Sequence, residues 1–198
     1  YAYLAIPSIA IFDLNVFAVR LPSVIFGILT ILATFFLVKE LFKKNSIALL
    51  TSFFLAISPW HIQFSRIAFE SNVGVAFNVF SILFFLKSFK RPWFLILSAI
   101  SLGLSMHVYQ GEKVFVPLLL IALIFFFKKM FLSINKKYIY SFVIILAILA
   151  LPLVHFTLTN KEALARARGV SIFSDSTLIQ SNAKKLVRDQ ERGDILGL

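Results

Sequence analysis

Long apolar runs separated by short polar segments fill the first 158 residues of this 198-residue chain. The runs lie at 22–38, 47–64, 67–86, 94–109, 114–127 and 138–158. A bilayer core of about 30 Å requires roughly 20 helical residues. The fourth and fifth runs are shorter, so they cross the bilayer only if they tilt or if neighbouring interfacial residues extend the helix. The pattern predicts an all-α fold, a polytopic membrane helix bundle with about six transmembrane helices.

The composition supports this interpretation. The chain is 60% hydrophobic, contains 24 Phe and has a mean hydropathy of +0.91, whereas a soluble domain is roughly 45–50% apolar. Cysteine is absent, which excludes disulfides and thiolate metal sites. The net charge of +11 would suggest a nucleic-acid partner if the protein were soluble. The distribution of this charge among the loops instead indicates a membrane protein with no nucleic-acid partner.

Basic residues gather in alternate loops. The opposite short loops contain only Arg20, Arg66 and Lys113. By the positive-inside rule the basic loops are cytoplasmic and the other loops face outward. The basic loops contain Lys39, Lys43 and Lys44, then Lys87, Lys90 and Arg91, then Lys128, Lys129, Lys136 and Lys137.

The polar tail forms the second predicted region, so that the chain divides into a transmembrane region at 1–158 and an outer-face segment at 159–198. Its stretch LIQSNAKKLV, at 178–187, predicts an amphipathic helix on the outer surface, or equally a solvated helix of a following domain. Because the first residue is Tyr1 rather than Met, we expect the chain to be a piece of a longer protein.

The stretch SPWHIQFSRIAFESN, at 58–72, places charges between two apolar runs. A charged side chain in hydrocarbon costs at least ~2.5 to 3.5 kcal/mol. If a helix begins near Ser65, Arg66 and Glu70 are i and i+4 and can pair, with Asn78 on roughly the same side. This arrangement is either an interfacial ion pair that ends a helix hairpin or a site in which the Arg66 fork binds phosphate.

A second polar cluster lies in SMHVYQGEKVFVP, at 105–117, and contains His107, Tyr109, Gln110, Glu112 and Lys113. Each has an ordinary structural alternative, such as an interfacial Tyr109 or a snorkelling Lys113. Both clusters face outward in the predicted topology, which is typical of a site for an amphiphilic substrate.

Two further residues have simpler interpretations. His155 is predicted to be a hydrogen-bonded core histidine, and Asp13 a helix cap. His61, His107 and His155 are far apart in the sequence, so no metal cluster and no cofactor is identified, and a requirement for a divalent metal stays open.

Three stretches together resemble the polyprenyl-phosphate-dependent glycosyltransferases of the protein O-mannosyltransferase and aminoarabinose transferase family, which have the C-type membrane glycosyltransferase fold. They are FAVRLPSVIFGILTILATFFLVKELF at 17–42, QFSRIAFES at 63–71 and MHVYQGEKVFVPLLL at 106–120. The resemblance implies inverting transfer of a sugar from a polyprenyl-phosphate carrier to a protein, lipid or glycan acceptor. The enzyme would be a multi-pass protein of a bacterial or archaeal plasma membrane, with its site on the outer face.

The resemblance also implies site residues. The family motif Gln-Ser-Arg-x-x-x-x-Asp is similar to Gln63, Ser65, Arg66 and Glu70. Here Phe64 is an extra residue, three rather than four residues separate Arg66 from the acid, and Glu stands in place of Asp. The substrate- or phosphate-binding set would be Arg66, Glu70, Gln63, His61, Tyr109, Glu112 and Lys113. The catalytic aspartate of the family lies in the first outer loop, which would place it upstream of Tyr1 together with the first span. The chain alone would then be inactive.

Two other functional classes remain open. A multi-spanning secondary transporter would use an intramembrane Arg/Glu pair, although the sequence shows no evident broken helix. A purely structural membrane subunit would tolerate alanine at the polar clusters.

Overall fold

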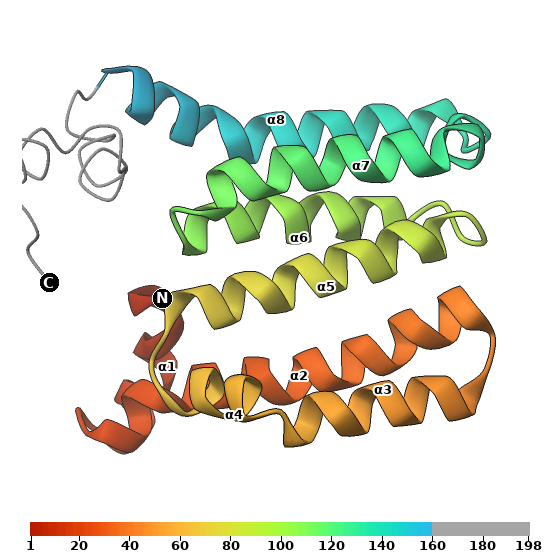
Figure 1. Cartoon of the computed structure of the whole chain (residues 1–198). Helices are drawn as coiled ribbons and strands as arrows, with labels where there is room; N and C mark the ends of the chain where they lie inside the picture. Colours follow the sequence, from red (N-terminus) through yellow and green to blue (C-terminus); the bar gives the residue numbers. More distant parts are fainter. Residues whose placement is uncertain (160–198) are drawn as a thin grey trace, which may run out of the picture. The chain divides into compact units, whose positions relative to one another are not determined.

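In the computed structural model, which describes residues 1–159, every regular element of the described chain is a helix (Figure 1). The all-α prediction is therefore confirmed, while the predicted amphipathic helix of the tail lies outside the described residues. The helices are α1 (Ala2–Phe12), α2 (Val16–Phe42), α3 (Asn45–Ile57), α4 (Pro59–Arg66), α5 (Glu70–Ser88), α6 (Phe94–Val108), α7 (Glu112–Leu132) and α8 (Lys136–Thr159).

Each predicted apolar run coincides with a helix or a helix pair. Helices α2, α5, α7 and α8 are long and apolar enough to cross a membrane, and α3 with α4 gives a fifth candidate span. Helix α6 has only 15 residues, so the described chain has four or five such spans by length rather than six. Helix α7 has a kink at Phe127, where the predicted run ends, and is helical again from Lys128 to Leu132. Helix α1 was not predicted.

The second run is broken at Ser58. Helices α3 and α4 are bent by 58° at this residue, which has the extended dihedral angles φ −62° and ψ 121°. Proline disfavours the α conformation of the residue before it, and its fixed φ suits the first turn of a new helix. Pro59 therefore ends α3 and begins α4, and the expectation that no helix is broken was wrong for this pair.

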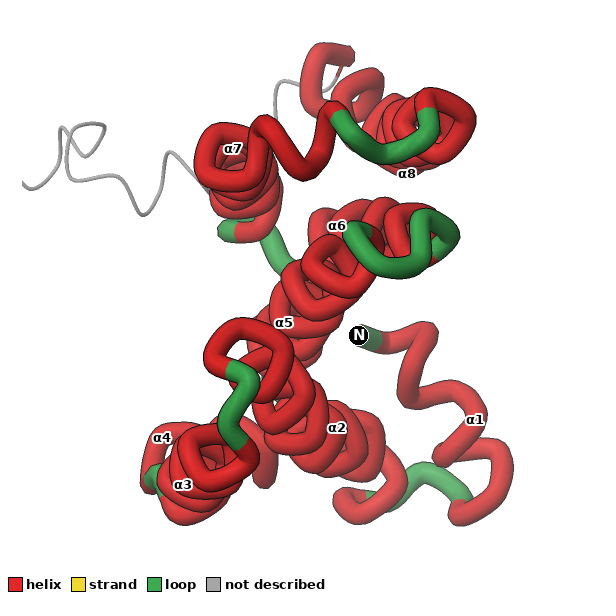
Figure 2. Tube along the Cα trace, turned by 90° about the vertical axis from the view of Figure 1, so that its right-hand side faces the viewer, coloured by secondary structure: helices red, strands yellow, loops and turns green. Residues whose placement is uncertain are grey.

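The structure divides into Tyr1–Leu151 and Pro152–Leu198. In the first unit α5 lies centrally, in contact with α2 on one side and with α6 and α7 on the other, while α2 also contacts α1, α3 and α4 (Figure 2). Of the second unit, only the end of α8 is described. His155 is exposed there, so the predicted core histidine was wrong.

Small residues bring the helices close together. Ser81, Ser98 and Ser105 are fully buried, and the Ser98 hydroxyl of α6 donates to the Ser81 carbonyl of α5 over 2.9 Å. A Cβ on Gly103 would lie 2.8 Å from the Leu149 Cβ of α8. Interfaces between membrane helices use such residues because small side chains allow backbones to approach. An apolar core centred on Phe85 fills the space between α5, α6 and α7.

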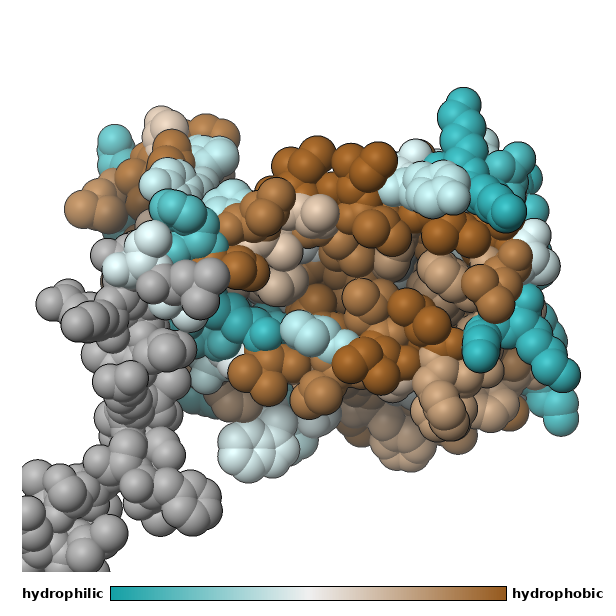
Figure 3. Space-filling model, turned by 90° about the horizontal axis from the view of Figure 1, so that it is seen from above, coloured by the Kyte–Doolittle hydropathy of each residue, from teal (hydrophilic) through white to brown (hydrophobic). Residues whose placement is uncertain are grey.

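The loops alternate between the two ends of the bundle. The α2–α3, α5–α6 and α7–α8 loops share one end, and the α4–α5 connection and α6–α7 turn share the other (Figure 1). Apolar side chains cover the middle of the face in Figure 3, and hydrophilic ones gather at its right-hand end. Glu40 accepts from Lys43 over 2.6 Å and from Lys90 over 2.7 Å, which ties two basic loops together. The grouping of the basic loops is thus confirmed, and their cytoplasmic side remains a prediction.

Candidate functional site

Helix α4 is fixed to α2 and α5 by polar contacts. The Ser23 hydroxyl donates to the Phe64 carbonyl over 3.1 Å, and the Asn72 amide of α5 donates to both the Ser23 carbonyl and its hydroxyl at 3.0 and 3.1 Å. The His61 Nε2 lies 3.1 Å from the Gly27 carbonyl. These contacts determine where the Arg66 end of α4 lies.

Helices α2 and α4 pack closely at Gly27. A Cβ at this position would lie 2.7 Å from the Ser65 Cβ, which is closer than real Cβ atoms approach one another. The Ser65 hydroxyl is buried and is the one buried side-chain oxygen or nitrogen of the described residues without a hydrogen-bond partner. Gly27 is therefore required for the position of α4. This close packing gives the Ser65 hydroxyl no hydrogen bond.

Arg66 ends α4 and Glu70 begins α5, separated by the non-helical segment 67–69. Both side chains are exposed, as is Gln63. Ion pairs within residues 1–159 join Glu40 to Lys43 and Lys90, and none joins Arg66 to Glu70. The predicted pair was wrong because its i,i+4 geometry requires one continuous helix, and here the chain leaves the helix at Ile67.

A row of aromatic rings connects the two predicted clusters. Trp60 stacks on Phe64 with ring centroids 5.8 Å apart, and Phe64 stacks on Phe69 at 5.1 Å. Phe69, between Arg66 and Glu70 in sequence, contacts the Tyr109 ring of the α6–α7 turn at 6.4 Å. Tyr109 is 39% exposed. The structure therefore brings residues 66–70, the Arg66 segment, and residues 109–111 between α6 and α7, the Tyr109 turn, to one end of the bundle.

Glu112 differs from the other predicted site residues because it is buried, with only 6% of its surface exposed. Its Oε2 accepts from the Asn78 amide over 2.7 Å, and the Asn78 Oδ1 accepts from the Ser105 hydroxyl over 3.0 Å. A Cβ on Gly74 would lie 2.8 Å from the Glu112 Oε1. Glu112 thus packs α7 against α5. Sequence reasoning identified neither Gly74, which lies against Glu112, nor Ser105, which bonds to Asn78.

The other residues of the second cluster lie nearer the surface. Lys113 is half-buried, and His107 is exposed with its Nδ1 2.9 Å from the Gly103 carbonyl. Asp13 is exposed at the end of α1; α2 is instead capped by Asn15, whose Oδ1 accepts from the Ala18 amide over 2.8 Å. Within the described part of the chain, no group of three or more His, Cys, Asp or Glu could hold a metal ion.

A cavity of 470 Å³ lies beside the Arg66 segment. Its lining includes Asn15 and Arg20 from the start of α2, and Ile67 and Ala68 from the segment that follows Arg66. Arg20 is exposed. The sequence analysis used Arg20 only in the count of charges in the loops. Its predicted position on the same side as Arg66 was the signal that could have assigned it to the site.

These features define a polytopic membrane protein in which a short Arg-bearing helix, an aromatic row and a polar turn meet at one end. The sequence model of the dolichyl-phosphate-mannose-protein mannosyltransferase family matches residues 1–155, and the chain belongs to this family of membrane glycosyltransferases. The family assignment made from the sequence is therefore confirmed. Searches of curated proteins and of solved structures found no match to the chain.

Proposed function

We propose that the chain forms the carrier-binding part of an inverting glycosyltransferase that moves a sugar from a polyprenyl-phosphate to an acceptor on the outer face of the membrane. The observation that carries the proposal is the meeting of the Arg66 segment with the Tyr109 turn through Phe69, in a chain whose family is named for a dolichyl-phosphate donor. An amphiphilic donor requires a cation for its phosphate and apolar surface for its chain.

Arg66 is the proposed phosphate ligand. It is exposed and forms no ion pair among the described residues, so its guanidinium remains available for two parallel hydrogen bonds to a phosphate. A departing carrier phosphate develops negative charge, which a pre-oriented cation stabilises in the transition state. The exposed Arg20 of the adjacent cavity supplies a second positive charge.

The remaining residues have supporting roles in this proposal. Polar contacts to the sugar and phosphate around Arg66 come from four side chains: Gln63, His61, Tyr109 and Lys113. Glu70 is exposed beside them and is free to accept from sugar hydroxyls. The catalytic carboxylate is proposed to lie outside residues 1–198.

The transporter alternative is less well supported. It required an intramembrane Arg/Glu pair, and Arg66 and Glu70 form none in the described structure. The break between α3 and α4 is shared with transporter helices, but Pro59 accounts for it locally.

The replacement Arg66→Lys in the intact enzyme tests the proposal. Charge is retained, but an ammonium cannot reproduce the planar fork, so we expect sugar transfer to fall by about 30- to 1000-fold, corresponding to roughly 2 to 4 kcal/mol. Arg91→Lys, at the opposite end of the bundle, is the matched control and should retain activity. Near-normal turnover of Arg66→Lys at all concentrations of the lipid carrier would contradict the phosphate-binding role and leave Arg66 only as an interfacial anchor of the helix.

A further inference from the structure

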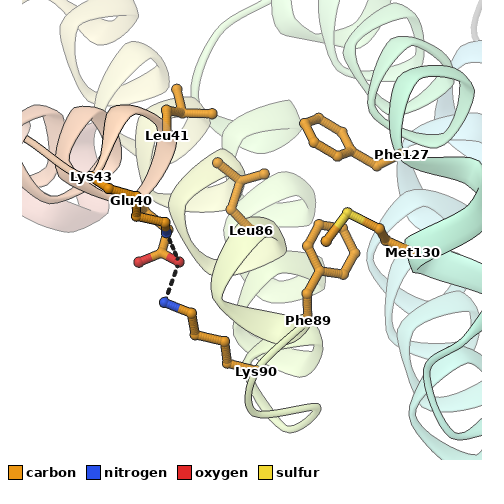
Figure 4. Close-up of a pocket in the computed structure, with 8 residues that line it drawn as sticks. All are labelled: Glu40, Leu41, Lys43, Leu86, Phe89, Lys90, Phe127 and Met130. Atoms are coloured by element: carbon orange, nitrogen blue, oxygen red, sulfur yellow. Dashed lines mark hydrogen bonds and ion pairs between the residues drawn. The ribbon is translucent and has the colours of Figure 1, made fainter.

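A cavity of 380 Å³ lies at the basic end of the bundle, opposite the candidate site. Its apolar wall is formed by Leu41 of α2, Leu86 and Phe89 at the end of α5, and Phe127 and Met130 of α7 (Figure 4). Lys43 and Lys90 line it as well, and both bind Glu40. One cavity therefore presents hydrocarbon surface and two ammonium groups.

A second cavity of 200 Å³ adjoins the first and shares Glu40 and Lys90 with it. Its lining adds Lys87, Arg91 and Phe94. The Lys87 ammonium lies 5.5 Å from the centroid of the Phe94 ring, a cation–π distance. With Glu40 as the one carboxylate, the three cations of this cavity leave it with an excess of positive charge.

Glu40 does not cancel this charge. Both ammonium groups approach the same Oε1, so one carboxylate brings two cations together beside the cavity. The hydrogen bond and charge of Glu40 raise the pKa of Lys90, which keeps Lys90 protonated. Each ammonium has three donors, and at least two remain for an additional anion.

Helix α7 is distorted where it lines the cavity. Phe127 has the non-helical dihedral angles φ −110° and ψ 19°, and its ring packs 5.7 Å from Phe89 and 6.2 Å from Phe85. This local break places the Phe127 ring on the cavity wall, while Met130, one turn later, is 48% exposed. The apolar wall is thus left open along its α7 side.

We propose that the two adjoining cavities form a binding site for an anionic phospholipid of the leaflet that contacts the basic loops. The phosphate and headgroup would bind among Lys87, Lys90 and Arg91, and one acyl chain would lie along Leu41, Phe89 and Met130. Charge complementarity selects an anionic over a zwitterionic lipid, and the apolar wall selects a lipid over free phosphate. The site is separate from the proposed carrier site, and it requires only that the chain span a membrane.

The test measures lipid binding to the intact protein by native mass spectrometry in detergent. Dioleoyl phosphatidylglycerol should bind, dioleoyl phosphatidylcholine should bind far more weakly, and inorganic phosphate should not displace the bound lipid. Removing both charges in Lys90→Gln/Arg91→Gln should weaken binding of phosphatidylglycerol by about fivefold for each charge. Met130→Trp, which fills the apolar cavity without changing charge, should also reduce binding.

Lys128→Gln/Lys129→Gln is the matched control, because these lysines lie at the same end but line neither cavity. This variant should retain wild-type binding, and equal loss in both double variants would overturn the site in favour of diffuse surface charge. Equal binding of the two lipids, or full displacement by inorganic phosphate, would also overturn it. A photo-crosslinker at Met130 should capture lipid in membranes, and capture of protein instead would show that a protein segment occupies the cavity. Thermal unfolding of each variant separates lost binding from lost folding.

Discussion

At the scale of single residues, polar side chains determine how the helices of this bundle fit together. Asn72 and Asn78, both buried on α5, bond to α2 and to α7 respectively. Apolar side chains pack in several registers with similar energy, whereas a buried amide has partners in only one. These two residues therefore align α5 with its neighbours on both sides.

We expect Gly74→Ala to destabilise the protein through Glu112. The new Cβ would lie 2.8 Å from the Glu112 Oε1 and 3.2 Å from its Cγ, so the carboxyl must move and weaken its bond to Asn78. The expected cost is about 1 to 3 kcal/mol, measured as a fall in the midpoint of thermal or denaturant unfolding in detergent.

A double-mutant cycle identifies the cause. In a Glu112→Ala background the obstruction is absent and alanine has the better helix propensity, so the same Gly74→Ala change should be neutral or stabilising. If it costs as much in that background, Glu112 is not the group that Gly74 accommodates.

The burial of individual site residues could be predicted from the sequence only in part. Glu112 and Lys113 are adjacent and both were assigned to the site, yet Glu112 is buried against α5 and Lys113 is half-buried. The difference depends on which side of α7 faces Asn78. That orientation arises from contacts distant in sequence, which local patterns do not contain.

At the scale of elements, α4 is the part on which the proposed site depends most. Its eight residues carry His61, Gln63 and Arg66, and its position results from contacts with Ser23 and Gly27 of α2. Pro59 favours a helix start and disfavours the α conformation of Ser58, but this signal alone could not have predicted α4. Other prolines of the described chain lie inside helices, namely Pro7, Pro22, Pro117 and Pro152. Helix α1 was missed because its apolar segment is short and contains Pro7.

We expect Gly27→Ala to reduce sugar transfer more than it reduces stability. The added Cβ would lie 2.7 Å from the Ser65 Cβ, so α4 must shift, and a displacement of Arg66 by about 1 Å can cost on the order of 100-fold in rate. The measurement is kcat and KM for transfer by the intact enzyme, beside its unfolding midpoint.

Replacing Ser65 by glycine should restore activity to Gly27→Ala, because it removes the atoms that obstruct the new Cβ. Ser65→Ala alone should be neutral or slightly stabilising, since the buried hydroxyl has no partner. Absence of rescue in Gly27→Ala/Ser65→Gly would mean that Gly27 acts by some route other than the position of α4.

At the scale of the whole molecule, the distribution of charge predicts which side of the membrane each end of the bundle contacts. The three basic loops share one end of the described structure, and the positive-inside rule places that end in the cytoplasm. The alternation of loops could be predicted because hydropathy and basic residues repeat together along the chain. The number of complete spans could not, because α6 and the bent α3–α4 pair fall short of a straight crossing.

Single cysteines introduced at Lys43, Lys90 and Lys129 should therefore resist a membrane-impermeant thiol reagent applied from outside intact cells. Residues 1–198 contain no cysteine, so no other position of this chain contributes labelling. A cysteine at Lys113, at the opposite end, is the matched control and should label. Labelling of any basic-loop position from outside would exclude this topology.

The distribution of carboxylates leads to a prediction about the chain itself. Residues 1–159 contain four carboxylates; Glu40 binds lysines at the basic end and Glu112 is buried against Asn78. Of these four carboxylates within the described residues, Asp13 and Glu70 are the exposed ones. If the catalytic carboxylate lies outside residues 1–198, as proposed, the 198-residue chain, purified in detergent, should bind polyprenyl-phosphate through Arg66 and should transfer no sugar.

Both properties can be measured side by side on the chain and on the intact enzyme. Carrier binding should fall in Arg66→Ala of either protein, because the proposed phosphate ligand lies within the chain, whereas His155→Ala, on an exposed face of α8, should leave it unchanged. Sugar transfer should appear in the intact enzyme alone. Turnover by the chain would place the base within residues 1–198, and Glu70 would then be the first residue to replace, because it begins α5 only four positions after Arg66, with Asp13 the second.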